Sequence, residues 1–243
     1  MLVNPTLTKL YELKLLGMAK AYQDQENIAD IGTLSFEERL GLLVDQEQTH
    51  RQNKRLSSRL KAARLRQSAC IEDIDLRYQR GLEKALLLQL SSCGWIKDHH
   101  NVLLTGPTGI GKSYIACALA NSACREGYKS LYLRLPRLLE DLGIAKADGR
   151  YNKLLIAFSR TDLLVLDDFG LSKLTDQHCR DLLEIIEDRY GLKSTIIASQ
   201  LPIKSWHDAM LDPTLADAIL DRLVHNAYKI NLNGESMRKE RKA

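Results

Sequence analysis

Residues 106 to 113 read GPTGIGKS, which matches the pattern G-x-x-x-x-G-K-[ST]. Glycines let such a loop turn tightly, so that its backbone N–H groups surround phosphate oxygens, and the helix that follows points its positive end at the same anion. In this pattern Lys112 reaches the β- and γ-phosphates and Ser113 binds Mg²⁺. The stretch predicts a nucleotide site whose contacts come from Gly106, Pro107, Thr108, Gly109, Ile110, Gly111, Lys112, Ser113 and Tyr114.

A second chemical group lies at residues 163 to 170, LLVLDDFG, where two aspartates close an apolar strand. Ligand sites of open α/β sheets lie at the carboxyl ends of the strands. We therefore expect Asp167 to hold Mg²⁺ through water and Asp168 to orient or deprotonate an attacking water. The alternative, a solvated strand end, is weakened by the phosphate loop earlier in the chain.

Together these groups predict hydrolysis of a nucleoside triphosphate by in-line attack of water. Phosphoryl transfer also gains from an arginine at the γ-phosphate, which is often supplied in trans by a neighbouring subunit. Arg222 follows a helical stretch near the end of the chain and is the candidate. Spacing alone leaves open that Arg222 is an ordinary surface residue.

The elements that position these groups follow from hydrophobic patterning. Apolar runs rich in strand-forming residues alternate with helical stretches, which is typical of a parallel α/β sheet. These runs occupy residues 101–105, 130–135, 162–167, 194–199 and 227–232. The expected fold is a P-loop NTPase of α/β class, with a five-stranded parallel sheet and flanking helices over residues 99–243. Residues 67–98 are expected to form a linker that contains a short helix near 82–90.

Residues 1–66 have apolar positions at helical spacing and are expected to form a small all-helical domain. Ser35 and Glu38 have the spacing of a capping box, so a helix is expected from about Phe36 into the stretch 51–66. That stretch holds seven Lys or Arg and no Asp or Glu, although the net charge of the whole chain is only +4.

On a helical wheel, six of these cations share one face opposite Leu56, Leu60 and Ala63. A solvated surface is the ordinary explanation of such a face. Here, however, no acidic residue alternates with the basic ones, so like charges repel unless a polyanion neutralises them. The face predicts contact with nucleic acid through Arg51, Lys54, Arg55, Arg59, Lys61 and Arg66.

Bulk properties exclude several classes of protein. No apolar run approaches 18 residues and the first residues lack the pattern of a signal peptide, so we expect no membrane span and a cytoplasmic location. The five cysteines are scattered without a CxxC pair, which argues against a disulfide framework or a zinc site and favours buried thiols.

Several motifs together resemble the IstB branch of AAA+ ATPases, which is close to the DnaC helicase loaders. The motifs are GPTGIGKS, LLVLDDFG, EDRYGLKSTIIASQLPIKSW, LDRLVH and NGESMR, and in the helical region LKLLGMAKAY, LSFEERLGLLVDQE and RQNKRLSSRLKAARL. The resemblance covers nearly the whole chain. It implies an ATPase with Mg²⁺ that binds duplex DNA cooperatively in an ATP-dependent way, forms homo-oligomers and stimulates an IstA-type partner transposase.

The resemblance also implies roles for particular residues. Lys112, Ser113 and Asp167 match the nucleotide and Mg²⁺ positions, and Asp168 matches the position that activates water. Ser199 and Gln200 occupy the sensor-1 place, where serine followed by asparagine is usual. Further matches are Arg222 at the arginine-finger position and Arg189 and Arg238 at possible sensor positions.

The chain is too short after its last strand for the helical lid of most AAA+ proteins, and the IstB and DnaC branch also lacks that lid. Arg238 either substitutes for a lid arginine or binds DNA with Lys239, Arg241 and Lys242. Two other functions stay open. One is a DnaC-like replicative helicase loader, which prefers single strands; the other is a scaffold that binds ATP but barely hydrolyses it, which Gln200 and Asp168 keep open.

Overall fold

The computed structural model describes residues 4–28, 31–78 and 80–237. The chain divides into two compact units, with the boundary between Ser58 and Arg59. This boundary comes earlier than the one expected after residue 66. The reason is that residues 59–66 pack within the second unit, where the Arg59 side chain donates a hydrogen bond to the Cys124 carbonyl.

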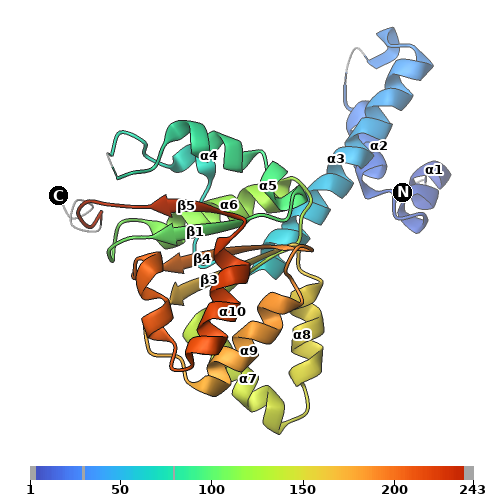
Figure 1. Ribbon diagram of the computed structural model, residues 1–243. Coiled ribbons are helices and arrows are strands. Elements are labelled where there is room, and N and C mark those ends of the chain that lie inside the picture. Colours follow the sequence, from blue (N-terminus) through green and yellow to red (C-terminus); the bar gives the residue numbers. More distant parts are fainter. Residues whose placement is uncertain (1–3, 29–30, 79, 238–243) are drawn as a thin grey trace. The chain divides into compact units, whose positions relative to one another are not determined.

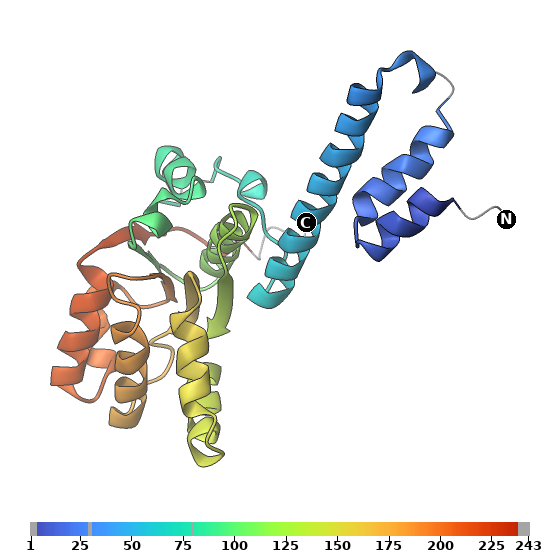
Figure 2. The same ribbon diagram turned by 90° about the vertical axis from the view of Figure 1, so that its right-hand side faces the viewer.

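The N-terminal unit is helical, as expected. It contains α1 (Pro5–Glu12), α2 (Leu16–Glu26), the short 3₁₀ turn η1 (Ile31–Thr33) and the first part of α3 (Phe36–Ala63). Figures 1 and 2 show α1 and α2 beside α3. The predicted capping box at the start of α3 is confirmed, since Glu38 N–H donates to Ser35 Oγ at 3.2 Å and Ser35 N–H donates to Glu38 Oε2 at 2.7 Å.

Helix α2 approaches α3 closely at Gly17, where a Cβ atom would lie 2.6 Å from the Gln46 carbonyl oxygen. Only a residue without a side chain fits this helix crossing. The Glu47 carboxylate then accepts hydrogen bonds from the Gly17 and Met18 N–H groups, at 2.7 and 3.2 Å. A residue on α3 therefore satisfies the open N–H groups at the start of α2.

The second unit is built on the predicted five-stranded parallel sheet, which is confirmed. Its strands are β1 (Asn101–Thr105), β2 (Ser130–Arg134), β3 (Leu163–Phe169), β4 (Ser194–Ser199) and β5 (Ala227–Asn231). They lie in the order β2-β3-β4-β1-β5, and each neighbouring pair is parallel. In this order β4 lies between β1 and β3, so the carboxyl ends of these three strands share one edge of the sheet, which is where ligands of such sheets bind.

Helices cover both faces of the sheet (Figure 1). Helices α4 (Lys84–Ser91), α5 (Gly94–Lys97) and α6 (Lys112–Arg125) pack on one face with Val102 and Val165, whereas the other face carries Leu103 and Leu164. On that second face lie α7 (Leu135–Ala147), α8 (Tyr151–Ser159), α9 (Asp176–Glu187) and α10 (Pro213–Val224). Successive strand residues point to opposite faces, so both faces of each central strand are apolar, as in other parallel sheets.

Residues 67–98 are not a free linker. They form the turn η2 (Ile71–Asp73) followed by α4 and α5, and Ala69, Leu90 and Trp95 belong to the core beneath α6. The stretches IEDID and SSCG that predicted a linker lie at η2 and at the junction of α4 and α5, and each contributes a buried residue to the core, Ile74 and Cys93. Two further 3₁₀ turns, η3 (Ile203–Ser205) and η4 (His207–Ala209), precede α10.

The part of the chain that the structure describes ends at Met237 and has no helix after β5. Within the described residues no helix is long and apolar enough to span a bilayer. Cys93, Cys117, Cys124 and Cys179 are buried free thiols and Cys70 is partly buried. Burial raises the pKa of the Cys93 thiol to about 11, so it stays protonated and unreactive at neutral pH.

Candidate nucleotide-binding site

The predicted phosphate loop joins β1 to α6. Gly106, Gly109 and Gly111 have φ values of 143°, 86° and 102°, which are backbone conformations that side-chain-bearing residues rarely adopt. At Gly106 space is also short, because a Cβ atom would lie 2.2 Å from the Leu232 carbonyl oxygen. The loop leads directly into the first turn of α6, whose N–H groups have no partner within the helix and face an anion in proteins of this type.

Lys112 is buried at the base of this loop, and its Nζ donates to the Gly106 and Pro107 carbonyl oxygens at 2.7 and 2.8 Å. The ammonium group is therefore folded back onto the loop. The C-terminal segment lies against the same loop, since Met237 N–H donates to the Gly109 carbonyl at 3.1 Å. Arg238, Lys239, Arg241 and Lys242 come next in the sequence and lie outside the described residues.

The predicted magnesium residues come together. Ser113 Oγ donates to Asp167 Oδ2 at 2.6 Å, and Asp167 is only 1% exposed at the carboxyl end of β3. The Tyr132 hydroxyl donates to the same carboxylate oxygen, and Asp168 N–H donates to Asp167 Oδ1 at 2.9 Å. Burial and Asp167 together raise the pKa of Tyr132, so the phenol stays protonated and remains a donor.

Asp168 has a left-handed backbone with φ of 63°, and the ladder between β3 and β4 shifts register between Leu166 and Phe169. This irregularity turns the Asp168 side chain away from the core, which a regular strand would not do. Its Oδ2 atom accepts a hydrogen bond from Arg134 Nε at 2.7 Å. The two adjacent aspartates thus have different surroundings: one carboxylate is buried and the other is paired at the surface.

The sensor-1 pair is divided between two roles. Ser199 is fully buried, and its hydroxyl donates to the Phe169 carbonyl at 2.7 Å and accepts from Leu201 N–H at 3.1 Å. It links the ends of β3 and β4. Because its single hydroxyl proton is donated to the Phe169 carbonyl, Ser199 has no proton left to donate to a phosphate. Gln200 is exposed beside the phosphate loop, where its Oε1 accepts from Thr108 Oγ1 at 2.7 Å. Of the pair, Gln200 is the residue placed to meet a nucleotide.

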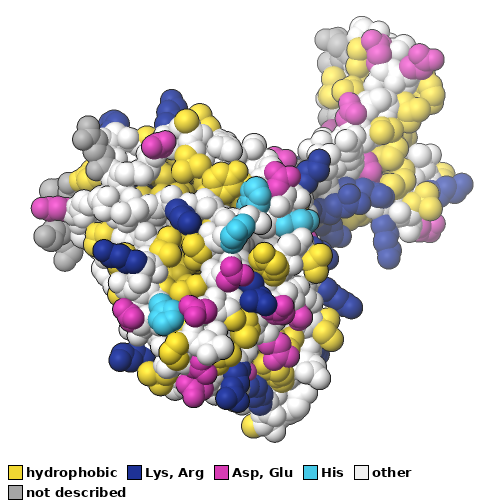
Figure 3. Space-filling model, in the orientation of Figure 1, with side chains coloured by type: hydrophobic (Ala, Val, Ile, Leu, Met, Phe, Trp, Pro, Cys, Tyr) yellow, Lys and Arg dark blue, Asp and Glu magenta, His cyan; other side chains and the backbone are white. Residues whose placement is uncertain are grey.

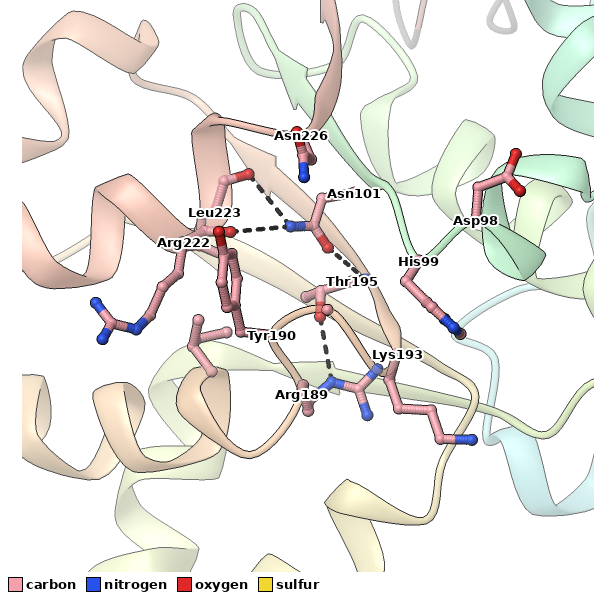
Figure 4. Close-up of a pocket in the computed structure, with 12 residues that line it drawn as sticks. Asp98, His99, Asn101, Arg189, Tyr190, Lys193, Thr195, Arg222, Leu223 and Asn226 are labelled. Carbon is pink, nitrogen blue, oxygen red and sulfur yellow. Dashed lines mark hydrogen bonds between the residues drawn. The ribbon is translucent and has the colours of Figure 1, made fainter.

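Arg222 lies at the opposite edge of the sheet from the phosphate loop. Its backbone carbonyl accepts from Asn101 Nδ2 at 3.3 Å, and Asn101 is the first residue of the strand whose last residue precedes Gly106 (Figure 4). The Arg222 guanidinium points away from Asn101 and pairs with Glu187. Because the length of β1 separates the two, Arg222 lies away from the phosphate loop of its own chain.

Arg189 is buried and hydrogen-bonded within its own unit. It is 1% exposed, and its guanidinium donates to the Phe158, Thr161 and Ser194 carbonyls and to Thr195 Oγ1 at the amino end of β4. Burial lowers the pKa of Arg189. The hollow beside it holds about 70 Å³, whereas ligand pockets usually hold roughly 300–1,000 Å³. The expectation of a sensor role therefore has no contact to support it.

The predicted basic face is only partly realised. Lys54, Arg55 and Lys61 are exposed on α3, and in Figure 3 the Lys and Arg side chains gather around the lower half of this helix, where α1 also lies. Arg51 pairs with Glu47 at 2.6 Å. Arg59 is partly buried through its hydrogen bond to Cys124.

The placement of Arg66 on the helical face is wrong. Helix α3 ends at Ala63 because Arg64 adopts a left-handed backbone with φ of 51°. Arg66 lies beyond that break, and its Nη1 atom is 3.7 Å from Asp167 Oδ2. It is therefore a neighbour of the predicted magnesium residues and not part of the helical face.

Sequence reasoning missed Tyr132, Arg134 and Arg80. The first two lie on β2, whose register pairs Arg134 with Asp167, so a strand-by-strand alignment of the predicted sheet would have brought them to this edge. Arg80 is 3% exposed and donates to the Ile110 carbonyl in the phosphate loop at 3.2 Å. Nothing in the local sequence marks Arg80, because this contact joins segments far apart in the chain.

The residues fit an ATP site with Mg²⁺. The three loop glycines form a cradle of backbone N–H groups, and the Ser113 hydroxyl and Asp167 carboxylate are the hard oxygen donors that Mg²⁺ prefers. The fold and this site define a P-loop nucleotide-binding protein of the AAA+ class.

Comparison with known proteins places the chain within that class. Residues 8–243 match the family described as "IstB-like ATP binding protein", so the chain belongs to this family. A protein of Sinorhizobium fredii that is named as an insertion sequence ATP-binding protein is 49% identical over 100% of this chain and 99% of its own length. The IS21 ATP-binding protein of Pseudomonas aeruginosa is 32% identical over 86% of this chain and 79% of its own length.

Solved structures agree in fold. The crystal structure of DnaI has a TM-score of 0.61 at 22% identity and covers 70% of this chain and 92% of DnaI. The DnaC helicase loader has a TM-score of 0.54 at 20% identity and covers 68% of this chain and 97% of DnaC. At this level of identity these likenesses establish the AAA+ fold.

Proposed function

We propose that this chain is an ATPase that assembles on duplex target DNA with ATP and Mg²⁺ and then recruits and stimulates the transposase of its insertion sequence. The observation that carries the proposal is the contact between Ser113 and Asp167 beneath the glycine loop, in a chain that matches an insertion-sequence ATP-binding family over both of its units. The helical N-terminal unit is part of that match. The match is therefore more specific than a likeness confined to the nucleotide-binding fold.

The chain's own residues divide the work of hydrolysis. Backbone N–H groups of residues 106–113 hold the phosphates, and Lys112 swings from the Gly106 and Pro107 carbonyls to meet them. Ser113 and Asp167 would hold Mg²⁺. The ion would neutralise negative charge on the β- and γ-phosphates. Once the Asp168 carboxylate separates from Arg134, it orients the attacking water. Gln200 lies beside the loop and contacts the γ-phosphate.

A second subunit completes the site in this proposal. Arg222 lies at the edge of the sheet opposite its own phosphate loop, so it serves a nucleotide bound by a neighbouring copy. The Arg222 guanidinium becomes available when its ion pair with Glu187 breaks. Assembly therefore depends on ATP, and each added copy places another α3 along the DNA.

The DNA contact comes from exposed cations on α3. Lys54, Arg55 and Lys61 address phosphates rather than base edges, so binding tolerates different sequences and weakens with salt. Repetition of a modest charge in every subunit adds many weak contacts along one duplex. This repetition explains why a chain of net charge +4 can hold a polyanion.

The decisive experiment measures the mass of complexes formed on duplex and on single-stranded DNA, with ATP and Mg²⁺, with ADP, and with the Lys112→Ala variant. Large ATP-dependent assemblies on duplex that Lys112→Ala abolishes are the expected result. Binding confined to single strands, or assembly only with a replicative helicase, would instead establish a DnaC-like loader. Assembly with ATP but without phosphate release would establish a nucleotide-gated scaffold.

A further inference from the structure

Arg66 occupies an unusual place for a residue of the basic segment. It follows the last residue of α3 after the left-handed Arg64, and its Nη1 atom lies 3.7 Å from the buried Asp167 Oδ2 atom. The Arg66 side chain is 45% exposed, whereas that of Asp167 is 2% exposed. An arginine from outside the sheet thus reaches over the carboxylate that is expected to serve Mg²⁺.

Three groups act on the Arg66 guanidinium. Interaction with the Tyr132 hydroxyl, followed by the charges of Asp167 and Asp168, raises the pKa of Arg66. Arginine keeps its charge at any pH of interest. Asp167 Oδ2 already accepts hydrogen bonds from Ser113 and Tyr132, so Arg66 adds a positive charge to a carboxylate whose hydrogen-bonding needs are met.

The Arg66 charge lies next to the carboxylate that is expected to bind Mg²⁺. Magnesium-binding residues gather on the same Oδ2 side of Asp167, because Ser113 donates to that atom. Two cations near one carboxylate repel each other, and the low solvent exposure of Asp167 reduces screening. Arg66 and Mg²⁺ therefore compete for Asp167.

The segment that carries Arg66 also contacts the helix of the phosphate loop. Arg59 Nε donates to the Cys124 carbonyl at 2.8 Å, near the carboxyl end of α6, while Lys112 and Ser113 lie at the amino end of α6. Residues 59–66 thus touch α6 at one end and Asp167 at the other. They are also continuous with the exposed cations of α3.

We propose that Arg66 is a positioning residue that neutralises Asp167 in the nucleotide-free chain and leaves it when magnesium–nucleotide binds, so that the end of the basic helix responds to the nucleotide state. This inference rests on the proposed nucleotide site. It assigns Arg66 to regulation of that site instead of to the DNA face.

The test is the Mg²⁺ concentration that half-saturates binding of a fluorescent ATP analogue to the full chain. Arg66→Gln removes the competing charge but keeps a donor for Tyr132, and it is expected to lower that concentration about three- to tenfold. Arg66→Lys restores a cation and should return the value to that of the wild type. Arg64→Gln removes one charge from an exposed side chain of the same segment, two residues from Arg66, and should leave the value unchanged.

A second readout follows the segment itself. Magnesium–nucleotide should speed hydrogen exchange of the backbone amides of residues 64–68 in the wild type, because Arg66 is released, and should have a smaller effect in Arg66→Gln. An unchanged or higher Mg²⁺ requirement in Arg66→Gln would overturn the inference while leaving the nucleotide site intact. Absence of Mg²⁺-dependent nucleotide binding in the wild type would overturn the proposed function as well.

Discussion

Asp167 and Asp168 are neighbours in sequence but different in chemistry. Asp167 is enclosed by Ser113, Tyr132 and a backbone N–H, whereas Asp168 adopts a left-handed backbone and meets Arg134 at the surface. Strained conformations of this kind persist where the surrounding structure imposes them, often at functional sites. In the proposed mechanism the pair therefore separates the binding of Mg²⁺ by Asp167 from the orientation of water by Asp168.

Replacing Asp168 by Asn tests that division. Asn tolerates a left-handed backbone, so the variant should fold, but it cannot accept a proton or orient water as a carboxylate does. We expect phosphate release to fall by roughly 10²-fold or more, while the affinity for a fluorescent ATP analogue stays unchanged. Asp45→Asn, an exposed site in the N-terminal unit, is the control. Turnover retained in Asp168→Asn would exclude Asp168 as the group that handles water.

At the scale of elements, Glu47 joins two helices of the N-terminal unit. Burial by itself raises the pKa of Glu47, but hydrogen bonds from Arg51, Met18 and Gly17 outweigh it and lower the pKa below its ordinary value of 4.5. A carboxylate with a lowered pKa in the folded state stabilises that state above its unfolded pKa. The stabilisation is lost as pH falls through the lower, folded pKa.

Glu47→Ala should loosen α2, because two N–H groups lose their acceptor. The expected cost is about 1–3 kcal/mol, seen as faster hydrogen exchange at the Gly17 and Met18 amides. In the wild type the same amides should lose protection as the pH drops below about 4.5. Glu47→Gln should show little pH dependence in this range. Equal protection of these amides in Glu47→Ala would show that Glu47 does not hold α2.

The exposed cations of α3 form the second test at this scale. Lys54→Glu combined with Arg55→Glu should weaken duplex binding at least tenfold and reduce the slope of log affinity against log salt by about 1.8, since two phosphate contacts are lost. Nucleotide binding should not change. The control reverses two charges elsewhere in the same unit, with Lys9→Glu and Lys20→Glu, both exposed. Equal losses in both variants would point to general electrostatics instead of this face.

At the scale of the whole molecule, the residues of the proposed site are divided between the two edges of the sheet. The phosphate loop and Asp167 lie at the carboxyl edge, and Arg222 lies beside the first residue of β1. Within one chain the length of β1 keeps the two apart. Hydrolysis is therefore expected to require contact between copies.

Mixing two inactive variants tests this arrangement. Arg222→Ala has an intact phosphate loop but no arginine to donate, and it should lose roughly 10²-fold or more of its turnover. Lys112→Ala has the arginine but a disabled loop. A mixture should regain part of the phosphate release on duplex DNA, because Lys112→Ala subunits supply Arg222 to the others. Arg180→Ala, an exposed site on α9, is the control. A mixture as inactive as its parts would contradict action in trans.

The sequence by itself determined the phosphate loop, the aspartate pair, the parallel sheet and the capped start of α3. These features depend on short-range patterns: glycine spacing, strand-length apolar runs and a Ser–Glu capping box all express their physics within a few residues. Whole-chain motif order also indicated the family, which the comparisons confirm.

Only the tertiary structure decided which side chains surround these features. It placed Tyr132 and Arg66 on Asp167, removed Arg66 from the helical face, and enclosed Ser199 and Arg189 in backbone hydrogen bonds. It also turned residues 67–98 from a linker into part of the core. Such contacts join residues distant in the chain, and their geometry follows from strand order and helix packing, which local patterns do not encode.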